Sequence, residues 1–225
     1  MRQALLVFSV LFIFWGEILA KEPDEKAIAA IEALGGKILR DLKKTEKPVT
    51  AVILRGSGVS DNSLTYVKRF TELASLDVTE TKITDQGLQE LKTLENLKFL
   101  VLTGTRVTDK GLVNLKRLVK LRFLRLDRTL VTDKGLKNLA LLKDLRLLTL
   151  RQTAVTDNGL AHLTQFHELG LLDLSMTKVT DAGLVHLKAL KKLVSLAVGG
   201  TGVTQEGVKE LKKALPKLKV NMEEQ

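Results

Sequence analysis

The stretch LKFLVLTGTRVTDKGLVNLKRL, residues 97–118, contains two successive hydrophobic spacings. Leu100 and Leu102 stand two residues apart, which is the period of a strand with one buried face. Leu112 and Leu115 follow at a three-residue step, which is typical of a short helix. The stretch therefore predicts a strand, a turn and a helix, in that order.

The pair Thr108–Asp109 stands directly before the predicted helix. A threonine oxygen can accept a hydrogen bond from a first-turn N–H, and an aspartate is stabilised at the positive end of the helix dipole. We therefore expect this pair to start the helix.

The whole pattern recurs every 24 residues, which gives seven units from Val49 to Pro216. Four columns of residues keep this step without a slip. They are the acidic column Asp61, Asp85, Asp109, Asp133, Asp157 and Asp181, with Gln205 in seventh place; the hydroxyl column Ser57, Thr81, Thr105, Thr129, Thr153, Thr177 and Thr201; the β-branched column Val59, Ile83, Val107, Val131, Val155, Val179 and Val203; and the glycine column Gly87, Gly111, Gly135, Gly159, Gly183 and Gly207. The first unit has Ser63 where the later units have glycine.

A single unit buries too little apolar surface to fold alone. About seven buried side chains contribute on the order of 10–20 kcal/mol, whereas ordering each residue of the unit costs about 1–2 kcal/mol in backbone entropy. Stacked units would share one core, with a parallel sheet on the concave face and helices on the convex face. In that stack, each hydroxyl of the Ser/Thr column can bond the backbone turn that leaves its strand.

The run Leu-x-x-Leu-x-Leu-x-x-Thr-x-Val-Thr-Asp-x-Gly-Leu, repeated over residues 49–216, resembles the leucine-rich repeat. It is most similar to the cysteine-containing subclass, with Thr in place of Cys, and to exported bacterial proteins that carry many such units. The resemblance implies a right-handed α/β solenoid that binds other molecules, usually on its concave side. The chain departs from intracellular members with an F-box, because residues 21–48 are too short for that domain.

Residues 1–20 have the pattern of an export signal. Arg2 precedes an apolar stretch of about 12 residues, which is shorter than the roughly 20 that a membrane-spanning helix needs. We expect cleavage after Ala20, which places the mature protein in the periplasm, at the cell surface or outside the cell, without a transmembrane span. The alternative is an uncleaved N-terminal anchor.

The other boundaries follow the repeat. Residues 21–48 are expected to form an N-terminal cap, with a helix from Asp24 to Leu34 and an extended segment from Lys37 to Leu42. Residues 49–216 hold the seven repeats. Residues 217–225 are expected to supply a last strand and a polar tail.

The composition and motifs exclude several kinds of chemistry. The chain has no cysteine, so it has no disulfide, no thiolate zinc site and no cysteine nucleophile. The sequence contains no recognisable order of nucleophile, base and orienting group, and no glycine-rich phosphate loop. We therefore expect neither enzymatic activity nor a cofactor.

Two sets of side chains invite a metal or acid–base interpretation. His162 and His186 occupy the same repeat position one unit apart, with His167 between them, but zinc sites usually have three or four protein ligands. The repeated Thr-Asp pairs favour a structural role, because every unit needs a helix start whereas catalysis needs one special site. We expect no metal site.

The variable strand positions carry the information about binding. The residue before the first leucine of each strand should face the concave side. This column runs Ala51, Ser75, Phe99, Phe123, Leu147, Leu171 and Ser195. Basic residues flank its four large apolar members, with Lys98, Arg122 and Arg146 on one side, and Arg125, Arg128 and Arg151 beside Asp127 on the other. Such a strip is typical of a surface that binds an anionic or amphipathic partner.

The same apolar strip also has a purely structural interpretation. Neighbouring Phe and Leu side chains stabilise a sheet by about 0.2–1 kcal/mol per pair without any ligand. The sequence leaves both interpretations open.

The charge balance narrows the kind of partner. The chain has 36 basic and 26 acidic residues, a net charge of +10, which favours a protein, acidic polysaccharide or phospholipid head group. Nucleic acid is disfavoured, because only two rings face the concave side and the remaining lysines are scattered over the helices. Our leading hypothesis is a non-catalytic exported module that binds through units three to six. The alternative is a structural or assembly solenoid of the cell envelope without a specific concave-face ligand.

Overall fold

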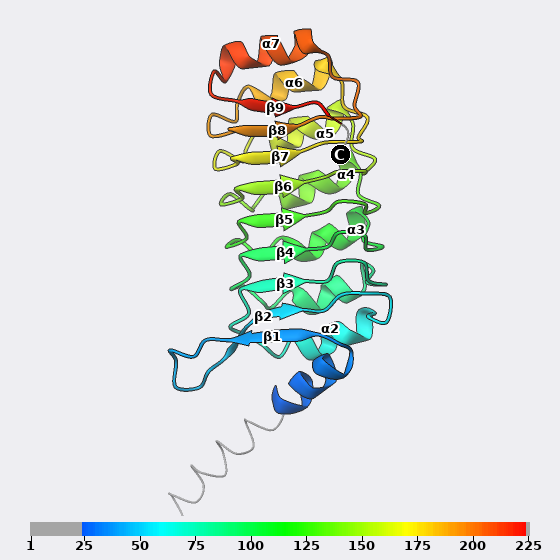
Figure 1. Cartoon of the computed structure of the whole chain (residues 1–225), viewed down its shortest axis with the longest axis vertical. Helices are drawn as coiled ribbons and strands as arrows, with labels where there is room; N and C mark the ends of the chain where they lie inside the picture. The colour runs from blue at the N-terminus through cyan, green and yellow to red at the C-terminus, as the bar shows by residue number, and fades with distance from the viewer. Residues whose placement is uncertain (1–23, 224–225) are drawn as a thin grey trace, which may run out of the picture.

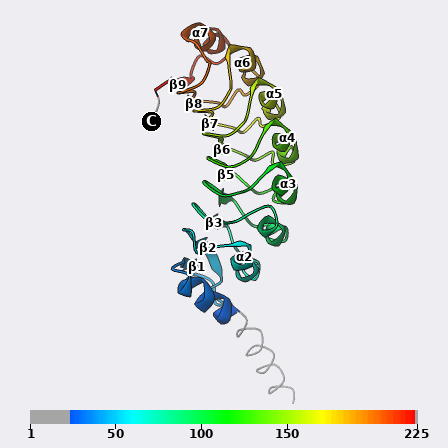
Figure 2. The same cartoon turned by 90° about the vertical axis from the view of Figure 1, so that its right-hand side faces the viewer.

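The computed structural model describes residues 24–223 and shows strands stacked in a solenoid (Figure 1). The sheet of this region has nine strands in chain order, so each strand pairs only with its neighbours in the sequence. Seen from the side, the sheet lines the concave face of an arc and the helices line the convex face (Figure 2). The predicted export signal, residues 1–20, lies outside the described residues.

Each strand is short, and from β2 onward the strands alternate with helical segments. The strands are β1 (Lys37–Arg40), β2 (Val49–Ile53), β3 (Ser75–Asp77), β4 (Phe99–Val101), β5 (Phe123–Arg125), β6 (Leu147–Thr149), β7 (Leu171–Asp173), β8 (Ser195–Ala197) and β9 (Lys219–Asn221). The α-helices are α2 (Asp61–Val67), α3 (Asp109–Leu112), α4 (Asp133–Leu136), α5 (Asp157–Leu160), α6 (Asp181–Leu187) and α7 (Gln205–Ala214). The 3-10 helices are η1 (Gly87–Leu91), η2 (Val113–Leu115), η3 (Lys137–Leu139) and η4 (Ala161–Leu163).

The strands from β2 to β9 are parallel and pair in the register of the repeat, so that residues 24 positions apart are direct partners. The inward leucines form one continuous core between the sheet and the helices. In the third unit, Leu100, Leu102, Leu112 and Leu115 are completely buried. The stacked α/β solenoid predicted from the sequence is confirmed.

A threonine closes the turn after each strand from β3 to β8. Thr105 Oγ1 donates a hydrogen bond to the carbonyl oxygen of Leu102 at 2.7 Å. The same bond to the residue three positions earlier is made by Thr81, Thr129, Thr153, Thr177 and Thr201. The hydroxyl therefore satisfies a carbonyl next to the apolar core, as the sequence predicted.

The convex helices are shorter than the leucine spacing suggested. Helix α3 has only four residues and continues directly as the 3-10 helix η2. A 3-10 helix has three residues per turn, which matches leucines at three-residue steps better than an α-helix does. The predicted cap is confirmed, because Thr108 Oγ1 accepts a hydrogen bond from the Lys110 N–H at 3.2 Å.

The repeated aspartates connect successive units. Asp109 Oδ1 accepts a hydrogen bond from the Thr132 N–H at 2.8 Å, and Asp109 Oδ2 accepts one from the Thr132 hydroxyl at 2.6 Å. Each of the six aspartates makes both bonds to the threonine of the next unit. We call this pair of bonds the Asp–Thr clasp. Five of the six aspartates are the first residue of an α-helix, as predicted, whereas Asp85 lies in the turn before η1. Their hydrogen-bond partners in the next unit were not predicted.

The clasp also explains the glycine column. A Cβ atom on Gly135 would overlap with Asp109 Oδ1, and the other five glycines face the aspartate of the preceding unit in the same way. The first unit lacks the glycine of this pattern, and the last unit lacks the aspartate. Ser63 belongs to the first unit and faces no earlier aspartate, and Gln205 belongs to the last unit and has no later threonine to bond.

The two ends of the solenoid are covered differently. At the N-terminal end, a helix that includes residues 24–33 buries Ala27, Ile28 and Ile31 against the core, and β1 pairs antiparallel with β2. At the C-terminal end, the ten-residue helix α7 buries Val208 and lies beside α6 (Figure 1). Both ends thus shield core side chains that a further repeat would otherwise cover.

Candidate partner-binding surface

Four large apolar side chains stand side by side on the concave face. In order across the sheet they are Phe99, Phe123, Leu147 and Leu171. Each is the direct register partner of the next, and with strands about 4.8 Å apart the four span about 14 Å. We call these residues the apolar column. Ser75 and Ser195 occupy the same position in the neighbouring units and bound the column on both sides.

The two phenylalanines of the apolar column stack on each other. The ring centroids of Phe99 and Phe123 are 4.5 Å apart and their planes differ by 7°. Phe99 keeps 42% of its surface exposed, and the other three members are half-buried. Such stacking contributes about 0.5–1.5 kcal/mol to the sheet, so the structural interpretation applies in part. The outer surface of the column is nevertheless open to a partner.

Three cations form a row along one side of the apolar column. Lys98, Arg122 and Arg146 stand directly before β4, β5 and β6, and we call them the basic margin. Their backbones are linked, because the Arg122 N–H donates to the Lys98 carbonyl at 2.9 Å and the Arg146 N–H to the Arg122 carbonyl at 2.8 Å. Lys98 and Arg146 are exposed, and Arg122 is half-buried.

The basic margin has little counter-charge of its own. Within residues 24–223, none of its three side chains forms an ion pair. The nearby Glu168 is already engaged by Lys192, whose hydrogen bond is the main cause of the lowered pKa of Glu168, with Arg146 contributing less. The charge of the basic margin is therefore available to a ligand.

The opposite side of the apolar column is largely neutralised. Asp127 accepts hydrogen bonds from the Thr149 hydroxyl at 2.7 Å and from the Arg151 backbone N–H at 3.0 Å. Arg151 is half-buried. Arg125 is exposed, and none of the ion pairs of the described region involves it. The flanks that looked alike in the sequence are thus electrostatically different.

Arg128 on the same side is paired with a carboxylate two units away. Glu80 forms an ion pair with Arg128 across the intervening Gly104. A Cβ atom on Gly104 would lie 2.7 Å from the Glu80 carboxylate, so the Glu80 side chain occupies the space that this glycine leaves open. All three residues have positive φ, 57° at Glu80, 68° at Gly104 and 52° at Arg128, because each occupies the same turn after its strand.

A further ion pair lies at the N-terminal end of the concave face. Arg55 Nε donates a hydrogen bond to Asp77 Oδ2 at 3.0 Å, and the Thr79 hydroxyl donates one to Asp77 Oδ1 at 2.6 Å. Burial raises the pKa of Asp77, but the hydrogen bonds from Arg55 and Thr79 outweigh it, so the pKa lies below its ordinary value. The carboxylate is therefore committed to these local contacts.

Two of the three histidines lie on the convex helices, and His167 lies in the turn after η4. His162 belongs to η4 and His186 to α6, and both are half-buried, whereas His167 is exposed. Among the described residues, no group of three or more His, Cys, Asp or Glu side chains is arranged to hold a metal ion.

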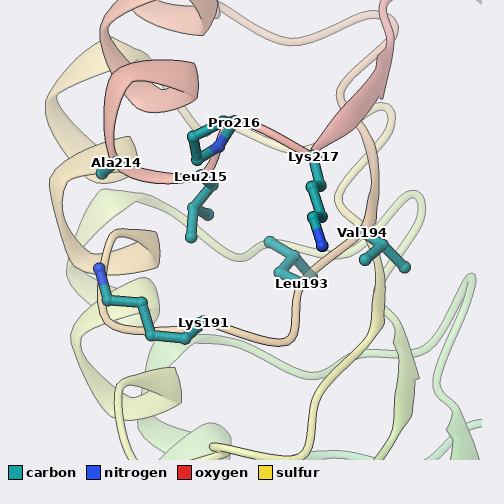
Figure 3. A pocket seen from close by; sticks show the side chains of 7 residues that line it. All are labelled: Lys191, Leu193, Val194, Ala214, Leu215, Pro216 and Lys217. Carbon is teal, nitrogen blue, oxygen red and sulfur yellow. The ribbon is translucent and has the colours of Figure 1, made fainter.

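A hollow of about 290 Å³ lies at the C-terminal end of the array, between the chain before β8 and the chain before β9 (Figure 3). Ala214 and Lys217 stand 24 residues after Leu190 and Leu193. The α-helical turn at the end of α7 shifts the buried leucines by one residue, to Leu215 and Leu218, which leaves Ala214 and Lys217 to line the hollow. The sequence signal for this hollow is the one-residue slip in the leucine pattern.

None of the helices within residues 24–223 has both the length and the apolar character needed to span a lipid bilayer.

Comparison with known proteins agrees with the observed repeat. Residues 73–92 and 93–116 match a family model described as a leucine-rich repeat. No curated protein sequence matches the chain.

Two solved structures share the solenoid. A leucine-rich-repeat protein of Leptospira interrogans superposes with a TM-score of 0.56 at 20% identity, over 70% of this chain and 39% of that one. The present chain thus corresponds to well under half of the Leptospira protein. Internalin C2 of Listeria monocytogenes superposes with a TM-score of 0.57 at 22% identity, over 77% of this chain and 80% of that one. The 24-residue motif, the matched repeats and the shared solenoid together show that the chain contains leucine-rich repeats and has the leucine-rich-repeat solenoid fold.

Proposed function

We propose that this protein is an exported, non-catalytic binding module whose ligand docks on the concave face of units three to six. The leucine-rich-repeat fold is in general a protein-binding fold, and a protein is therefore the first candidate ligand. An anionic polysaccharide or lipid head group of the cell envelope is the other candidate. The contact residues of the proposal are Phe99, Phe123, Leu147, Leu171, Arg122, Arg125, Arg128, Arg146 and Arg151.

The observation that carries the proposal is the apolar column beside the basic margin. Large apolar side chains on a sheet surface are costly to leave in water, and aromatic and arginine side chains are enriched where proteins bind one another. Phe99 remains 42% exposed even with its ring stacked on Phe123. The concave face therefore offers apolar area and uncompensated positive charge in the same place.

Export is supported by the sequence pattern of residues 1–20. Removal of these residues takes away one base, Arg2, and one acid, Glu17, so the net charge stays at +10. A strongly positive protein associates faster with a negatively charged partner, and the rate falls as salt screens the attraction.

Affinity capture with a matched pair of variants tests the proposed surface. The concave variant is Phe123→Glu with Arg125→Glu. The control is Val185→Glu on α6 with Lys188→Glu at its C-cap, which likewise replaces one apolar and one basic residue, on exposed convex positions. Both variants must show the circular dichroism spectrum of the parent. Extracts of the cells that produce the protein are then passed over each immobilised form, and the bound proteins and polymers are identified.

We expect the control to retain the ligands of the parent and the concave variant to lose them. Equal capture by parent and concave variant would refute docking on this face. Small-angle scattering distinguishes the assembly alternative, because concentration-dependent elongation of the purified protein, with no ligand captured, supports a structural solenoid instead.

A further inference from the structure

We infer that the segment that docks on the concave face is an acidic amphipathic α-helix of a partner protein, lying across the strands. Its apolar stripe would cover the apolar column, and its carboxylates would face the basic margin. This inference rests on the proposed function and specifies the form, direction and charge of the ligand.

The direction of the partner follows from how the apolar side chains are arranged. Along the single strand β5, the concave face presents Phe123 and then Arg125, so a partner aligned with the strands meets one apolar group followed by a cation. Across the strands, four apolar side chains stand in line from Phe99 to Leu171. An apolar stripe of a partner can therefore match the column only if it crosses the strands.

The spacing of the column distinguishes a helix from an extended chain. The column advances about 4.8 Å per strand, and a helix advances about 5.4 Å per turn, so three steps accumulate a mismatch of about 2 Å. Same-face residues of an extended chain are about 6.6 Å apart, which gives a mismatch of about 5 Å, more than one full strand spacing. Side-chain rotamers can absorb the first mismatch but not the second. A helix of about ten residues covers the whole column.

The one-sided charge completes the match. Lys98, Arg122 and Arg146 stand directly before consecutive strands, so they too repeat at close to one helical turn. On the other side of the column, the three cations Arg125, Arg128 and Arg151 are accompanied by two carboxylates, Asp127 and the Glu80 that pairs with Arg128, so this side carries less net positive charge than the basic margin. A helix with carboxylates on only one side of its apolar stripe would satisfy this arrangement. Its acidic side would also fix in which direction the helix runs along the solenoid.

Synthetic peptides of about 18 residues test the inference directly. The probe peptide has leucine at every third or fourth position and glutamate in one adjacent stripe. The first control has the same residues in shuffled order, the second has two prolines in the middle of the probe, and the third has lysine in place of glutamate. Binding of each fluorescently labelled peptide to the full protein is measured by anisotropy at low and moderate salt.

We expect the probe peptide to bind at least about tenfold more tightly than each of the three controls, and to weaken as salt is raised. On the protein side, Arg122→Gln with Arg146→Gln should weaken probe binding by about tenfold or more. The matched convex variant, Lys188→Gln with Lys212→Gln, should change it less than about twofold. The lysine peptide tests the same charge contact without altering the protein, so the result does not depend on one variant folding.

Several outcomes would overturn the inference. Equal binding of the proline-containing or shuffled peptide would show that helical form and stripe geometry are not recognised. Tight binding to vesicles of anionic phospholipid, lost in the Arg122→Gln, Arg146→Gln variant and without preference among peptides, would assign the surface to a membrane instead. If the probe fails to bind while extract capture still depends on Phe123 and Arg125, the helix inference fails and the proposed function stands. If capture is also insensitive to these residues, both fail.

Discussion

The Asp–Thr clasp predicts that Gly135→Ala destabilises the parent protein but does not destabilise a variant that lacks Asp109. In the parent protein, Gly135→Ala places a Cβ atom into the space of Asp109 Oδ1, 3.2 Å from the Asp109 Cγ atom. The carboxylate must then leave Thr132. In the Asp109→Ala background this obstacle is gone, and alanine is a better helix residue than glycine.

The magnitudes follow from the contacts in the structure. The clasp has two hydrogen bonds to a charged acceptor, each contributing about 1.5–3 kcal/mol when well formed, and both are partly buried. We expect Asp109→Ala and Gly135→Ala each to lower the free energy of unfolding by about 2–4 kcal/mol. In the Asp109→Ala background, Gly135→Ala should leave the free energy of unfolding unchanged or raise it by up to about 1 kcal/mol. The higher helix propensity of alanine is then opposed only by contact of its Cβ atom with the flexible end of Leu112.

Urea denaturation followed by circular dichroism measures all four members of this cycle. The coupling energy between the two positions should be at least about 2 kcal/mol, with the denaturant slope compared throughout because repeat arrays can lose cooperativity. Gly170→Ala is the matched control, since its Cβ would meet nothing closer than 3.7 Å, and it should be close to neutral. Additive effects, with a coupling below about 0.5 kcal/mol, would refute the clasp as the cause of the glycine column.

Three further predictions concern the Thr129 turn, the half-buried Asp77 carboxylate and the export signal. Thr129→Val should lower the free energy of unfolding by about 1–2 kcal/mol in a urea titration, whereas Thr129→Ser should retain most of it, because the lost hydroxyl leaves a buried carbonyl under-satisfied. Since the pKa of Asp77 is lowered in the folded state, its carboxylate stabilises the fold at neutral pH and this contribution disappears as the pH falls through the folded-state pKa. Asp77→Asn should therefore be less stable than the parent at pH 7, with the difference shrinking below about pH 4, as thermal unfolding over a pH series would show. The exported protein should begin at Lys21 on N-terminal sequencing and lack tryptophan fluorescence, because Trp15 is the only tryptophan; a mature chain that begins at Met1 contradicts the predicted cleavage.

The stacking of the units could be predicted because it depends on short-range patterns. The two-residue spacing of Leu100 and Leu102 defines a buried strand face, and the 24-residue step defines which residues become neighbours across strands. This step predicts that Phe99 and Phe123 lie side by side, and the structure pairs them directly. The 3-10 conformation of η2 could not be predicted, because leucines at three-residue steps fit both an α-helix and a 3-10 helix over so short a segment.

The clasp could not be predicted with the same reasoning. Helix capping explains a Thr-Asp pair in every unit, so the periodicity of Asp109 alone gives no reason to look for a partner in the next unit. The available signal lies at the ends of the array. Glycine is missing only from the first unit, at Ser63, and aspartate only from the last, at Gln205. This is the pattern expected of a contact in which each unit supplies one component to the next.

The electrostatic difference between the two sides of the apolar column was also hidden in the sequence. Arg128 and Arg146 look equivalent as flanking cations. The positive φ of Arg128 and the absence of a side chain at Gly104 allow Glu80 to reach the first, whereas the carboxylate near the second, Glu168, pairs with Lys192 instead. Which cation is neutralised depends on backbone conformation and on a residue two units away.

The self-contained joint between units has a consequence for how this protein can change in length. Because every interior boundary is built from the same aspartate, threonine and glycine, an in-frame duplication or deletion of one interior unit recreates native boundaries on both sides. The scaffold is thus free to grow or shrink in whole modules over generations. The four-membered apolar column is not interchangeable in this way, so selection for a ligand would show itself as a block of modules whose order and number stay fixed.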